Sequence, residues 1–267
     1  MIDLHCHLLP GIDDGAPDDA TSIEMARIAA ADGIRTTACT PHIYPGLFEN
    51  DGTDIALRIA NLQRALDEAG IALELTIGAD AHLSPELLRR LGDTTAPTLA
   101  GSRYFLLEPP HTVAPPRFAD AVLDFVSAGF IPVITHPERL MWIEQHYAVF
   151  AGLVDGGAWM QVTAGSLTGR FGRNAQYFGR KMLDDGLVHI LATDAHGTQH
   201  RAPLLAEGRR AAEELVGTEE AAQLVCSRPQ AILDNHPPET VAPVRALREG
   251  RNAASRRGFF ARLLRRG

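Results

Sequence analysis

The chain has 267 residues, of which 45% are hydrophobic, and a formal net charge of −8 at pH 7. One α/β barrel typically takes about 250 residues, and this hydrophobic share is enough for a folded core, so a largely disordered chain is disfavoured. Residues 245–267 hold eight arginines and one acid, Glu249, which leaves −15 on the preceding residues and disfavours nucleic acid as a partner.

Cysteine usage and hydropathy suggest a cytoplasmic protein. No pair among Cys6, Cys39 and Cys226 has the CxxC spacing, so neither a disulfide framework nor a thiolate metal site is expected. The first residues contain no basic region followed by a long apolar stretch, and no later segment offers about 18 uninterrupted apolar residues. We therefore predict a soluble protein without a membrane span.

Apolar runs of strand length alternate along the chain with stretches of helical periodicity. The predicted strands are Ile2–Leu4, Thr36–Thr40, Leu73–Ile77, Tyr104–Leu107, Pro132–Thr135, Trp159–Val162 and Val188–Thr193. The predicted helices include Asp19–Asp32, Thr53–Ala69, Arg117–Ala128 and Asn174–Asp185, each followed by a glycine. Alternating strands and helices predict a parallel sheet or barrel of the α/β class.

Almost every predicted strand ends in a side chain that can bind a metal ion. These side chains are His5, His7, His42, Asp80, Glu108, His136, Asp194 and His196. In a parallel barrel the carboxyl ends of the strands face one common mouth, so residues far apart in the sequence converge there. The sequence therefore predicts one metal site built from distant residues.

The opening segment Asp3-Leu4-His5-Cys6-His7 places two imidazoles at alternate positions. Alternate residues lie on the same side of an extended strand, so both imidazoles can reach one ion. An isolated His-x-His pair is a weak signal, and two ordinary histidines are the simpler interpretation. Three further features strengthen the metal interpretation, namely Asp13-Asp14-Gly15, Thr40-Pro41-His42 and Thr193-Asp194-Ala195-His196.

Three segments resemble the PHP (polymerase and histidinol phosphatase) family, in particular its bacterial tyrosine-phosphatase branch in capsule and exopolysaccharide systems. They are His5-Cys6-His7-Leu8-Leu9-Pro10-Gly11-Ile12-Asp13-Asp14-Gly15, Thr135-His136-Pro137-Glu138-Arg139 and Asp194-Ala195-His196-Gly197. The resemblance implies a distorted seven-stranded (β/α) barrel similar to a TIM barrel, which agrees with the predicted strands. We assign this domain to residues 1–240 and an Arg-rich tail to residues 241–267.

The resemblance also implies three divalent metal ions. Their ligands would be His5, His7, Asp80 and Asp194 for the first ion, Asp80, Glu108 and His136 for the second, and Asp14, His42 and His196 for the third. One position departs from the family, which usually has glutamate where this chain has Asp80. Aspartate is one methylene shorter, so the spacing or occupancy of the ions is expected to differ. His82, two residues further on, either compensates or is incidental.

The donor set indicates phosphoester hydrolysis. Imidazole and carboxylate ligands without thiolate suit Mn²⁺, Fe²⁺ or Zn²⁺, and the resemblance favours manganese. Ions about 3.5 to 4 Å apart stabilise an in-line displacement at phosphorus. Arg139 and Arg201 match arginines that the family uses to bind phosphoryl oxygens, for which a guanidinium offers planar, forked contacts. A surface salt bridge is the alternative interpretation for each arginine.

No motif for a covalent nucleophile is present. Cysteine-based tyrosine phosphatases need arginine six residues after the thiolate, and here those positions hold Ile12, Pro45 and Ile232. A GxxxxGK[ST] phosphate loop and a GxSxG elbow are also absent. Ordinary surface or loop roles are expected for the remaining histidines, His111, His146, His189, His200 and His236.

The predicted function is therefore a metal-dependent protein-tyrosine phosphatase. The resemblance implies, as its substrate, the phosphotyrosine-bearing tail of a membrane-anchored bacterial tyrosine kinase that controls capsule or exopolysaccharide biosynthesis. Two alternatives remain, a small-molecule phosphatase such as a histidinol-phosphate phosphatase and a non-catalytic metal-binding regulatory module. The segment 10–15 favours the tyrosine phosphatase over the first, and candidates at all nine ligand positions disfavour the second.

The Arg-rich tail interleaves Phe259, Phe260, Leu263 and Leu264 with basic residues. This pattern is typical of a short basic amphipathic helix on anionic lipid, which would give weak contact with the inner face of the membrane. A solvated, disordered tail is the alternative, and the shortness and the glycines of the segment favour it. The sequence leaves both interpretations open.

Overall fold

The computed structural model describes residues 1–244. Its strands are β1 (Ile2–Cys6), β2 (Thr36–Cys39), β3 (His42–Ile43), β4 (Glu74–Ile77), β5 (Asp80–His82), β6 (Tyr104–Glu108), β7 (Ile131–Thr135), β8 (Trp159–Thr163) and β9 (Ile190–Ala192). Its helices are α1 (Asp19–Ala31), α2 (Gly52–Glu68), α3 (Leu87–Gly92), α4 (Phe118–Ser127), α5 (Ile143–Asp155), α6 (Ala164–Leu167), α7 (Gly172–Asp184), α8 (Ala206–Val216), α9 (Thr218–Ala222) and α10 (Arg228–Leu233). Shorter turns are the 3₁₀ segments η1 (Leu99–Gly101), η2 (Pro137–Arg139) and η4 (Pro238–Thr240) and the π turn η3 (Gln223–Ser227).

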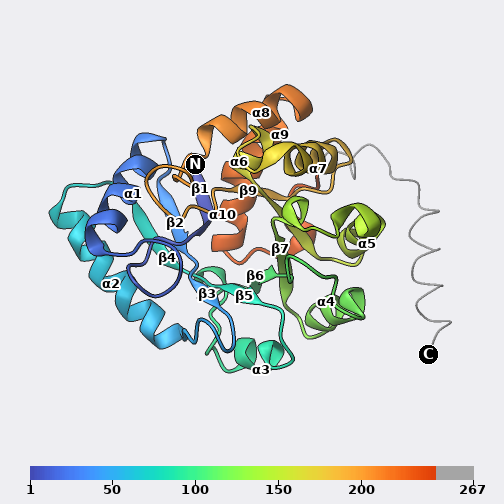
Figure 1. The fold of residues 1–267 in the computed structure, drawn as a ribbon, viewed down its shortest axis with the longest axis horizontal. Helices are drawn as coiled ribbons and strands as arrows, with labels where there is room; N and C mark the ends of the chain where they lie inside the picture. Colours follow the sequence, from blue (N-terminus) through green and yellow to red (C-terminus); the bar gives the residue numbers. More distant parts are fainter. Residues whose placement is uncertain (245–267) are drawn as a thin grey trace.

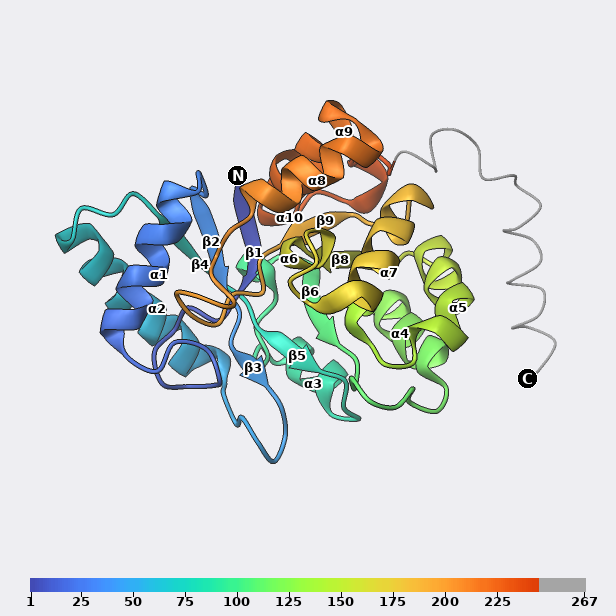
Figure 2. The same ribbon diagram turned by 45° about the horizontal axis from the view of Figure 1, so that its top comes forward.

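The described strands pair in parallel throughout, in two sheets. One sheet has the order β1-β2-β4 and the other the order β3-β5-β6-β7-β8-β9. Figure 1 shows the strands in the middle of the molecule, with α1 and α2 on one side and α4, α5 and α7 on the other. The turned view keeps this arrangement (Figure 2). The prediction of a parallel α/β fold is confirmed.

Two of the predicted strand segments continue beyond a short break into a second strand. Pro41, which has no backbone N–H, lies between β2 and β3, and Gly78 lies between β4 and β5. Hydrogen bonds nevertheless bridge the breaks, because Gly78 N donates to Cys39 O at 3.1 Å and Asp80 N donates to Pro41 O at 3.1 Å. The breaks give the described chain nine strands where seven were predicted.

The first strand also contacts the segment that follows the last strand. Asp194 N donates to His5 O at 2.8 Å, and His7 N donates to Ala195 O at 2.9 Å. Cys6 and Ala195 form a parallel bridge. The first strand and the segment after β9 therefore lie side by side.

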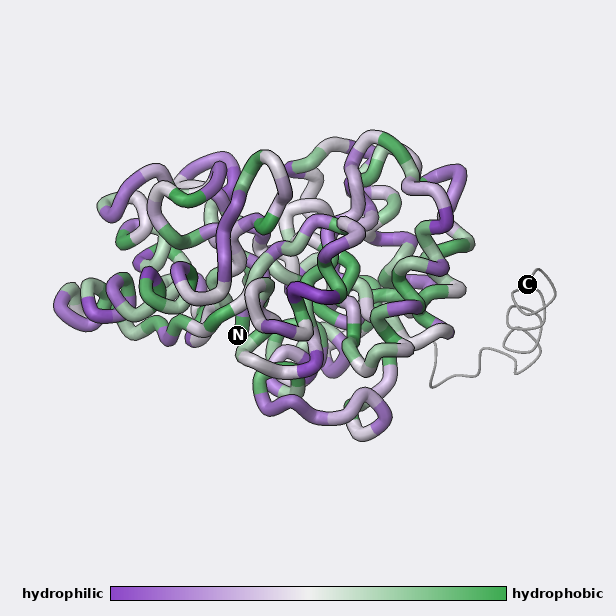
Figure 3. The backbone as a smooth tube through the Cα atoms, turned by 90° about the horizontal axis from the view of Figure 1, so that it is seen from below, coloured by the Kyte–Doolittle hydropathy of each residue, from purple (hydrophilic) through white to green (hydrophobic). Residues whose placement is uncertain are grey.

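The helices begin and end where local chemistry favours it. Asp18 caps α1 by accepting a hydrogen bond from Thr21 N, and Asp51 caps α2 by accepting from Thr53 N and Asp54 N. Glycine in the left-handed region follows α1, α2, α4 and α7, as at Gly33, where φ is +91°. The predicted helices Asp19–Asp32 and Thr53–Ala69 are thus confirmed within a residue of their ends. Figure 3 shows hydrophobic and hydrophilic positions alternating along the outer helices.

Buried residues form two clusters, and alternate strand residues divide between them. The smaller cluster takes Ile2 and Leu4 from β1, Tyr104 and Leu106 from β6, and Val133 from β7, among others. The larger cluster takes the intervening residues, such as Phe105 and Leu107, together with the inner faces of the helices. The sheets therefore have one face toward the helices and one toward a separate apolar interior.

No described helix is long and apolar enough to cross a bilayer. The predicted tail is described only from residue 241 to residue 244, so the interpretations of its basic and aromatic residues fall outside the described part of the chain.

Candidate metal centre

The structure gathers all nine predicted ligands at the carboxyl ends of the strands. His5 is the second-last residue of β1 and His7 directly follows that strand, His42 and Asp80 begin β3 and β5, Glu108 ends β6, and His136 follows β7. Asp194 and His196 follow β9, and Asp14 lies in the loop between β1 and α1. Overlapping groups with ligand atoms within 4.8 Å of one another link these residues into one cluster.

A bulge in β1 helps to aim the first two histidines. The register of β1 against β2 shifts between Asp3 and Cys6, and such a shift redirects the following side chains. Cys6 packs into the larger apolar cluster, while the Nε2 atoms of His5 and His7 lie 3.2 Å apart. Both Nε2 atoms also approach Asp194 Oδ1, at 3.3 and 3.5 Å. The sequence prediction that both imidazoles reach one point agrees with this placement.

The outer nitrogens of these two imidazoles have partners of their own. His5 Nδ1 lies 3.0 Å from Gln161 Oε1, and His7 Nδ1 lies 2.7 Å from Asp13 Oδ2. Oxygen acceptors at Nδ1 favour the tautomer that carries the proton there, which leaves the Nε2 lone pair free for an ion. Gln161 and Asp13 therefore orient the first two candidate ligands.

Asp14 forms a second part of the cluster with three imidazoles. Its Oδ1 lies 3.5 Å from His42 Nε2 and 3.3 Å from His196 Nε2, and His7 belongs to the same group. The neighbouring Gly15 makes this placement possible, because a Cβ there would lie 2.3 Å from His7 O. The loop carrying Asp14 can approach the histidines only with glycine at this position.

Asp80 is the candidate ligand shared by two ions, and the surroundings of its carboxylate favour a bound cation. The residue is fully buried, and neither carboxylate oxygen has a hydrogen-bond partner among the described residues. Burial raises the pKa of Asp80, but the charges of His5, His42 and His136 outweigh burial and hold the pKa below its usual value. An ionised, buried carboxylate without hydrogen bonds is costly unless a positive charge compensates it.

Burial and neighbouring charges shift the pKa values of two imidazoles in the cluster in opposite directions. Burial lowers the pKa of His7, but the hydrogen bond and charge of Asp13, and then those of Asp194, outweigh burial and raise the pKa to about 10. Burial and the charge of His7 lower the pKa of His196 to about 4. The carboxylates around His7 thus require positive charge next to them. Divalent ions would satisfy this requirement with the same donor atoms and displace protons on binding, so the residues fit a metal centre.

Two candidate ligands have backbone conformations that are unusual for residues other than glycine. His136 has φ of +35° and Asp194 has φ of +51°. Such conformations cost about 1 to 3 kcal/mol and concentrate at functional sites. The fold accepts this cost at the two positions where the chain turns directly after β7 and β9.

The two predicted arginines lie at the edge of the cluster, on the same carboxylate. Arg201 Nη2 donates to Asp194 Oδ2 at 2.7 Å, and Arg139 Nη1 donates to the same oxygen. The Phe171 ring lies beside both guanidinium groups, at 4.3 Å from Arg139 Cζ and 5.9 Å from Arg201 Cζ. Neither arginine forms the surface salt bridge of the alternative interpretation, since Asp194 is buried.

The sequence interpretation did not assign five residues that contact the cluster. Asp13 lies inside a motif that the sequence analysis singled out, whereas Gln161 and Phe171 carry no motif. His82 and His111 both lie near Glu108, although an ordinary role was expected for His111. The sequence analysis had noted His82 for its position two residues after Asp80, whereas His111 carried no signal beyond its residue type.

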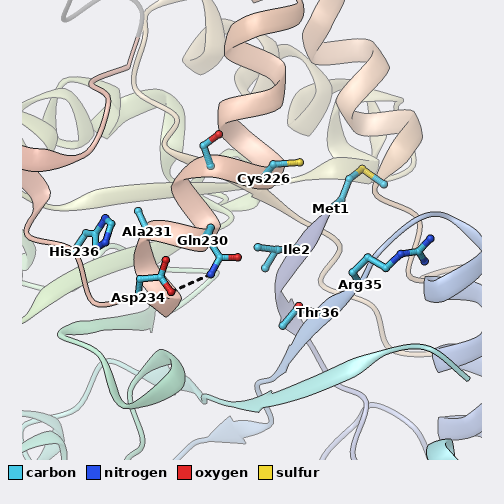
Figure 4. Close-up of a pocket in the computed structure, with 10 residues that line it drawn as sticks. Met1, Ile2, Arg35, Thr36, Cys226, Gln230, Ala231, Asp234 and His236 are labelled. Carbon is cyan, nitrogen blue, oxygen red and sulfur yellow. Dashed lines mark hydrogen bonds between the residues drawn. The ribbon is translucent and has the colours of Figure 1, made fainter.

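A separate cavity lies at the opposite ends of the strands. It has a volume of about 590 Å³ and is lined by Ile2 and Thr36, at the starts of β1 and β2, and by Gln230 and Asp234 near α10 (Figure 4). None of the nine candidate ligands lines it. A cavity of about 370 Å³ beside the cluster is lined by His196 and Arg201.

Comparison with known proteins identifies the family. The chain matches the family model "Capsular polysaccharide synthesis, CpsB/CapC" over residues 1–234. Tyrosine-protein phosphatase YwqE of Bacillus subtilis is 38% identical over 202 residues, covering 75% of this chain and 79% of that protein. Tyrosine-protein phosphatase CpsB of Streptococcus agalactiae is 26% identical over 245 residues, covering 88% of this chain and 99% of that protein.

Solved structures agree with the sequence matches. A structure from work on YwqE of Bacillus subtilis and CpsB of Streptococcus pneumoniae, described as "unique metal-dependent tyrosine phosphatases", matches with a TM-score of 0.85 and 33% identity, covering 92% of this chain and 100% of that chain. Dihydropyrimidinase from Brevibacillus agri, with a TM-score of 0.53 and 12% identity, shares the fold alone. The resemblance noted in the sequence is confirmed, and the chain belongs to the CpsB/CapC family of capsular polysaccharide synthesis.

Proposed function

We propose that the chain is a metal-dependent protein-tyrosine phosphatase, a phosphoric monoester hydrolase of capsule or exopolysaccharide synthesis. The observation that carries the proposal is the convergence of nine imidazole and carboxylate side chains beside two arginines. YwqE and CpsB, which match over most of their length, are tyrosine-protein phosphatases. Their names favour a phosphotyrosine substrate over histidinol phosphate.

We assign the candidate ligands to three divalent ions, as the resemblance implied. Manganese is the proposed ion, and Fe²⁺ or Zn²⁺ suits the same donors. The close approach of Asp14, His42 and His196 supports the third set, and that of His5, His7 and Asp194 supports the first. The bridging role of Asp80 between the first and second ions is supported by its Oδ2 atom, which lies 3.4 Å from His5 Nε2 and 4.0 Å from His136 Nε2.

The roles of the protein groups follow from their placement. When bound, the ions would supply Lewis-acid stabilisation of phosphoryl oxygens and favour loss of a proton from water. Asp13 and Gln161 hold the imidazoles of His7 and His5 in the tautomer that faces the centre. A guanidinium has five N–H donors, more than a bond to Asp194 uses, so Arg139 and Arg201 can each bind a phosphoryl oxygen. A phenolate leaving group, with a pKa of about 10, needs little help from a general acid, and none is assigned.

We further propose that residues 1–240 form a distorted seven-stranded (β/α) barrel. In this arrangement β2 with β3 and β4 with β5 each count as one interrupted strand. The hydrogen bonds from Asp194 to His5 and from His7 to Ala195 support closure between the first and last strands. The separate apolar interior, which contains Leu4 and Leu106, also fits a closed sheet.

The proposed substrate is a phosphotyrosine-bearing tail of a membrane-anchored bacterial tyrosine kinase, and a cytoplasmic location stays a prediction. The family's role in capsular polysaccharide synthesis supports such a partner. Weak contact of the Arg-rich tail with an anionic membrane remains part of the proposal. Co-sedimentation with anionic liposomes that is unchanged by truncation at Ala242 would remove that part.

The test is hydrolysis of a phosphotyrosyl peptide by metal-stripped protein after addition of Mn²⁺, Zn²⁺ or Mg²⁺. We expect activity to return with metal and to fall at least about 100-fold in His136→Ala and Arg139→Ala, since each removes a group that stabilises developing charge. The exposed His146→Ala is the matched control and should remain active. Faster turnover of histidinol phosphate than of the phosphotyrosyl peptide would favour the small-molecule phosphatase. Wild-type protein that binds metal but hydrolyses neither substrate would favour the non-catalytic module.

A further inference from the structure

Four imidazoles surround Glu108, two on each carboxylate oxygen. Oε2 lies 3.4 Å from His42 Nδ1 and 3.5 Å from His82 Nδ1. Oε1 lies 3.7 Å from His111 Nε2 and 3.9 Å from His136 Nε2. Glu108 Oε1 therefore lies near the imidazole of His111, which the resemblance did not imply as a ligand.

Three side chains, those of Glu108, His111 and His136, form a group that could hold one metal ion. One ligand atom from each lies within 4.8 Å of the others. Two ligands that share an ion at about 2.1 Å cannot be more than about 4.2 Å apart. Both imidazole distances to Glu108 Oε1 are below this limit.

Asp80 lies closer to the first set of ligands than to Glu108 and His136 taken together. Its Oδ2 lies 3.4 Å from His5 Nε2 but 4.0 Å from His136 Nε2. Among the described residues, Asp80 groups with His5 and His7 and also with His42 and Glu108, but not with Glu108 and His136 together. Asp80 Oδ2 still lies within the limit for sharing an ion with His136, so His111 would be added to Asp80 on this ion and would not replace it.

The position of His111 is fixed by the backbone around it. Met141 N donates to His111 O at 3.0 Å, and Trp142 Nε1 donates to Pro110 O at 2.8 Å. These bonds fasten the turn after β6 to the segment that follows Arg139. The His111 ring consequently lies 4.9 Å from the His136 ring, with about a third of its side chain exposed at the rim of the centre.

We propose that His111 is a further ligand of the metal ion held by Glu108 and His136. The inference rests on the proposed metal-dependent function. An additional imidazole favours Mn²⁺, Fe²⁺, Co²⁺ or Zn²⁺ over Mg²⁺, which prefers oxygen ligands. His111 thus contributes to the choice of metal as well as to its retention.

The test measures metal binding directly. Metal-stripped full-length protein is titrated with Mn²⁺ by calorimetry, and bound metal is counted by elemental analysis after dialysis, for wild type, His111→Ala and His82→Ala. We expect His111→Ala to weaken one bound ion at least about tenfold, on the scale that loss of a group supporting a metal site produces. His82→Ala is the matched control, because it also removes an imidazole next to Glu108 but His82 is not a member of the group of Glu108, His111 and His136. This variant should bind all ions as wild type does.

Chemical rescue separates a ligand from a structural role. Because His111 is partly exposed, free imidazole added to His111→Gly is expected to restore the weakened site and the visible absorption of the Co²⁺-loaded protein. Unchanged metal affinity in His111→Ala would overturn the inference while leaving the metal centre intact, as would equal losses in both alanine variants. Wild type that binds no metal would instead overturn the proposed function itself.

Discussion

At the scale of single residues, Phe171 lies where the two arginines meet. It is the last residue before α7, and its ring faces the guanidinium groups of Arg139 and Arg201. A cation over an aromatic face is stabilised by about 0.5 to 2 kcal/mol, more when solvent is excluded. Phe171 therefore holds both arginines beside Asp194 without taking a hydrogen bond from either.

Replacement of this ring should weaken catalysis without loss of metal. We expect Phe171→Ala to lower kcat/KM for a phosphotyrosyl peptide about 2- to 30-fold, the range that corresponds to the lost cation–π energy. Bound metal, counted by elemental analysis, should not change. Tyr177→Ala on α7 is the control, since that side chain is 60% exposed. Wild-type kinetics in Phe171→Ala would show that Asp194 alone positions the arginines.

Eight of the nine candidate ligands could be predicted from the sequence because each combines a metal-binding side chain with the end of a predicted strand, whereas Asp14, in the loop after β1, was implied by the resemblance. His5 and His7 illustrate this, as alternate residues on one strand. Gln161 and Phe171 could not be predicted, because an amide within a strand and an aromatic residue before a helix are common and carry no motif. His111 was given an ordinary role because its proximity to Glu108 depends on how the turn after β6 folds.

At the scale of elements, the contact between α8 and α6 depends on one glycine. A Cβ on Gly208 would lie 2.5 Å from Ala164 Cβ and 2.7 Å from Ala164 Cα. The two helices approach closely here, and α6 directly follows β8. An alanine at position 208 would clash with Ala164 and force α8 away from α6.

Gly208→Ala should therefore destabilise the protein, although alanine normally favours a helix over glycine by about 1 kcal/mol. We expect a loss of about 1 to 3 kcal/mol in the free energy of unfolding, as for overpacked sites. Urea denaturation at fixed metal concentration measures it. Gly92→Ala at the end of α3 is the control, because nothing lies within 4 Å of the added methyl group. Equal stability of the two variants would contradict the close-packing argument.

The positions of the predicted strands follow from short apolar runs, and the structure confirms these positions. The breaks did not appear in the prediction, because β3 has only two residues and β5 only three, too few for any periodicity. Their pairing depends on neighbours, as in the hydrogen bond from Asp80 N to Pro41 O. Local sequence therefore located the elements but not the division into two sheets.

At the scale of the whole molecule, one buried histidine away from the metal centre affects how stability depends on pH. His189 packs against Trp159 with ring centroids 4.7 Å apart, and its Nδ1 accepts a hydrogen bond from Met160 N at 3.2 Å. Burial, and then the charge of Arg228, lower the pKa of His189 to about 3. The folded protein therefore keeps this imidazole neutral at acidic pH.

The unfolded chain, in which the histidine pKa is about 6.5, takes up a proton between about pH 6.5 and 3 that the folded chain does not. Stability consequently falls as the pH falls through this window. His189→Asn removes the titration, so the stability lost between pH 7.5 and 5 should be about 2 kcal/mol smaller than in wild type. Urea denaturation of both proteins at both pH values measures the difference. Parallel pH profiles would contradict the prediction.

The pairing of β1 with the segment after β9 has a consequence for biosynthesis. His5 and His7 leave the ribosome early, whereas Asp194 and His196 are made about 10 to 40 s later at ordinary rates of translation. The hydrogen bond from Asp194 N to His5 O can form only then, and it closes a very long loop. A nascent chain thus carries incomplete sets of ligands for the first and third ions, and these two sets become complete only after the segment that follows β9 has emerged. The full complement of ions therefore has to be supplied to chains whose synthesis has passed His196.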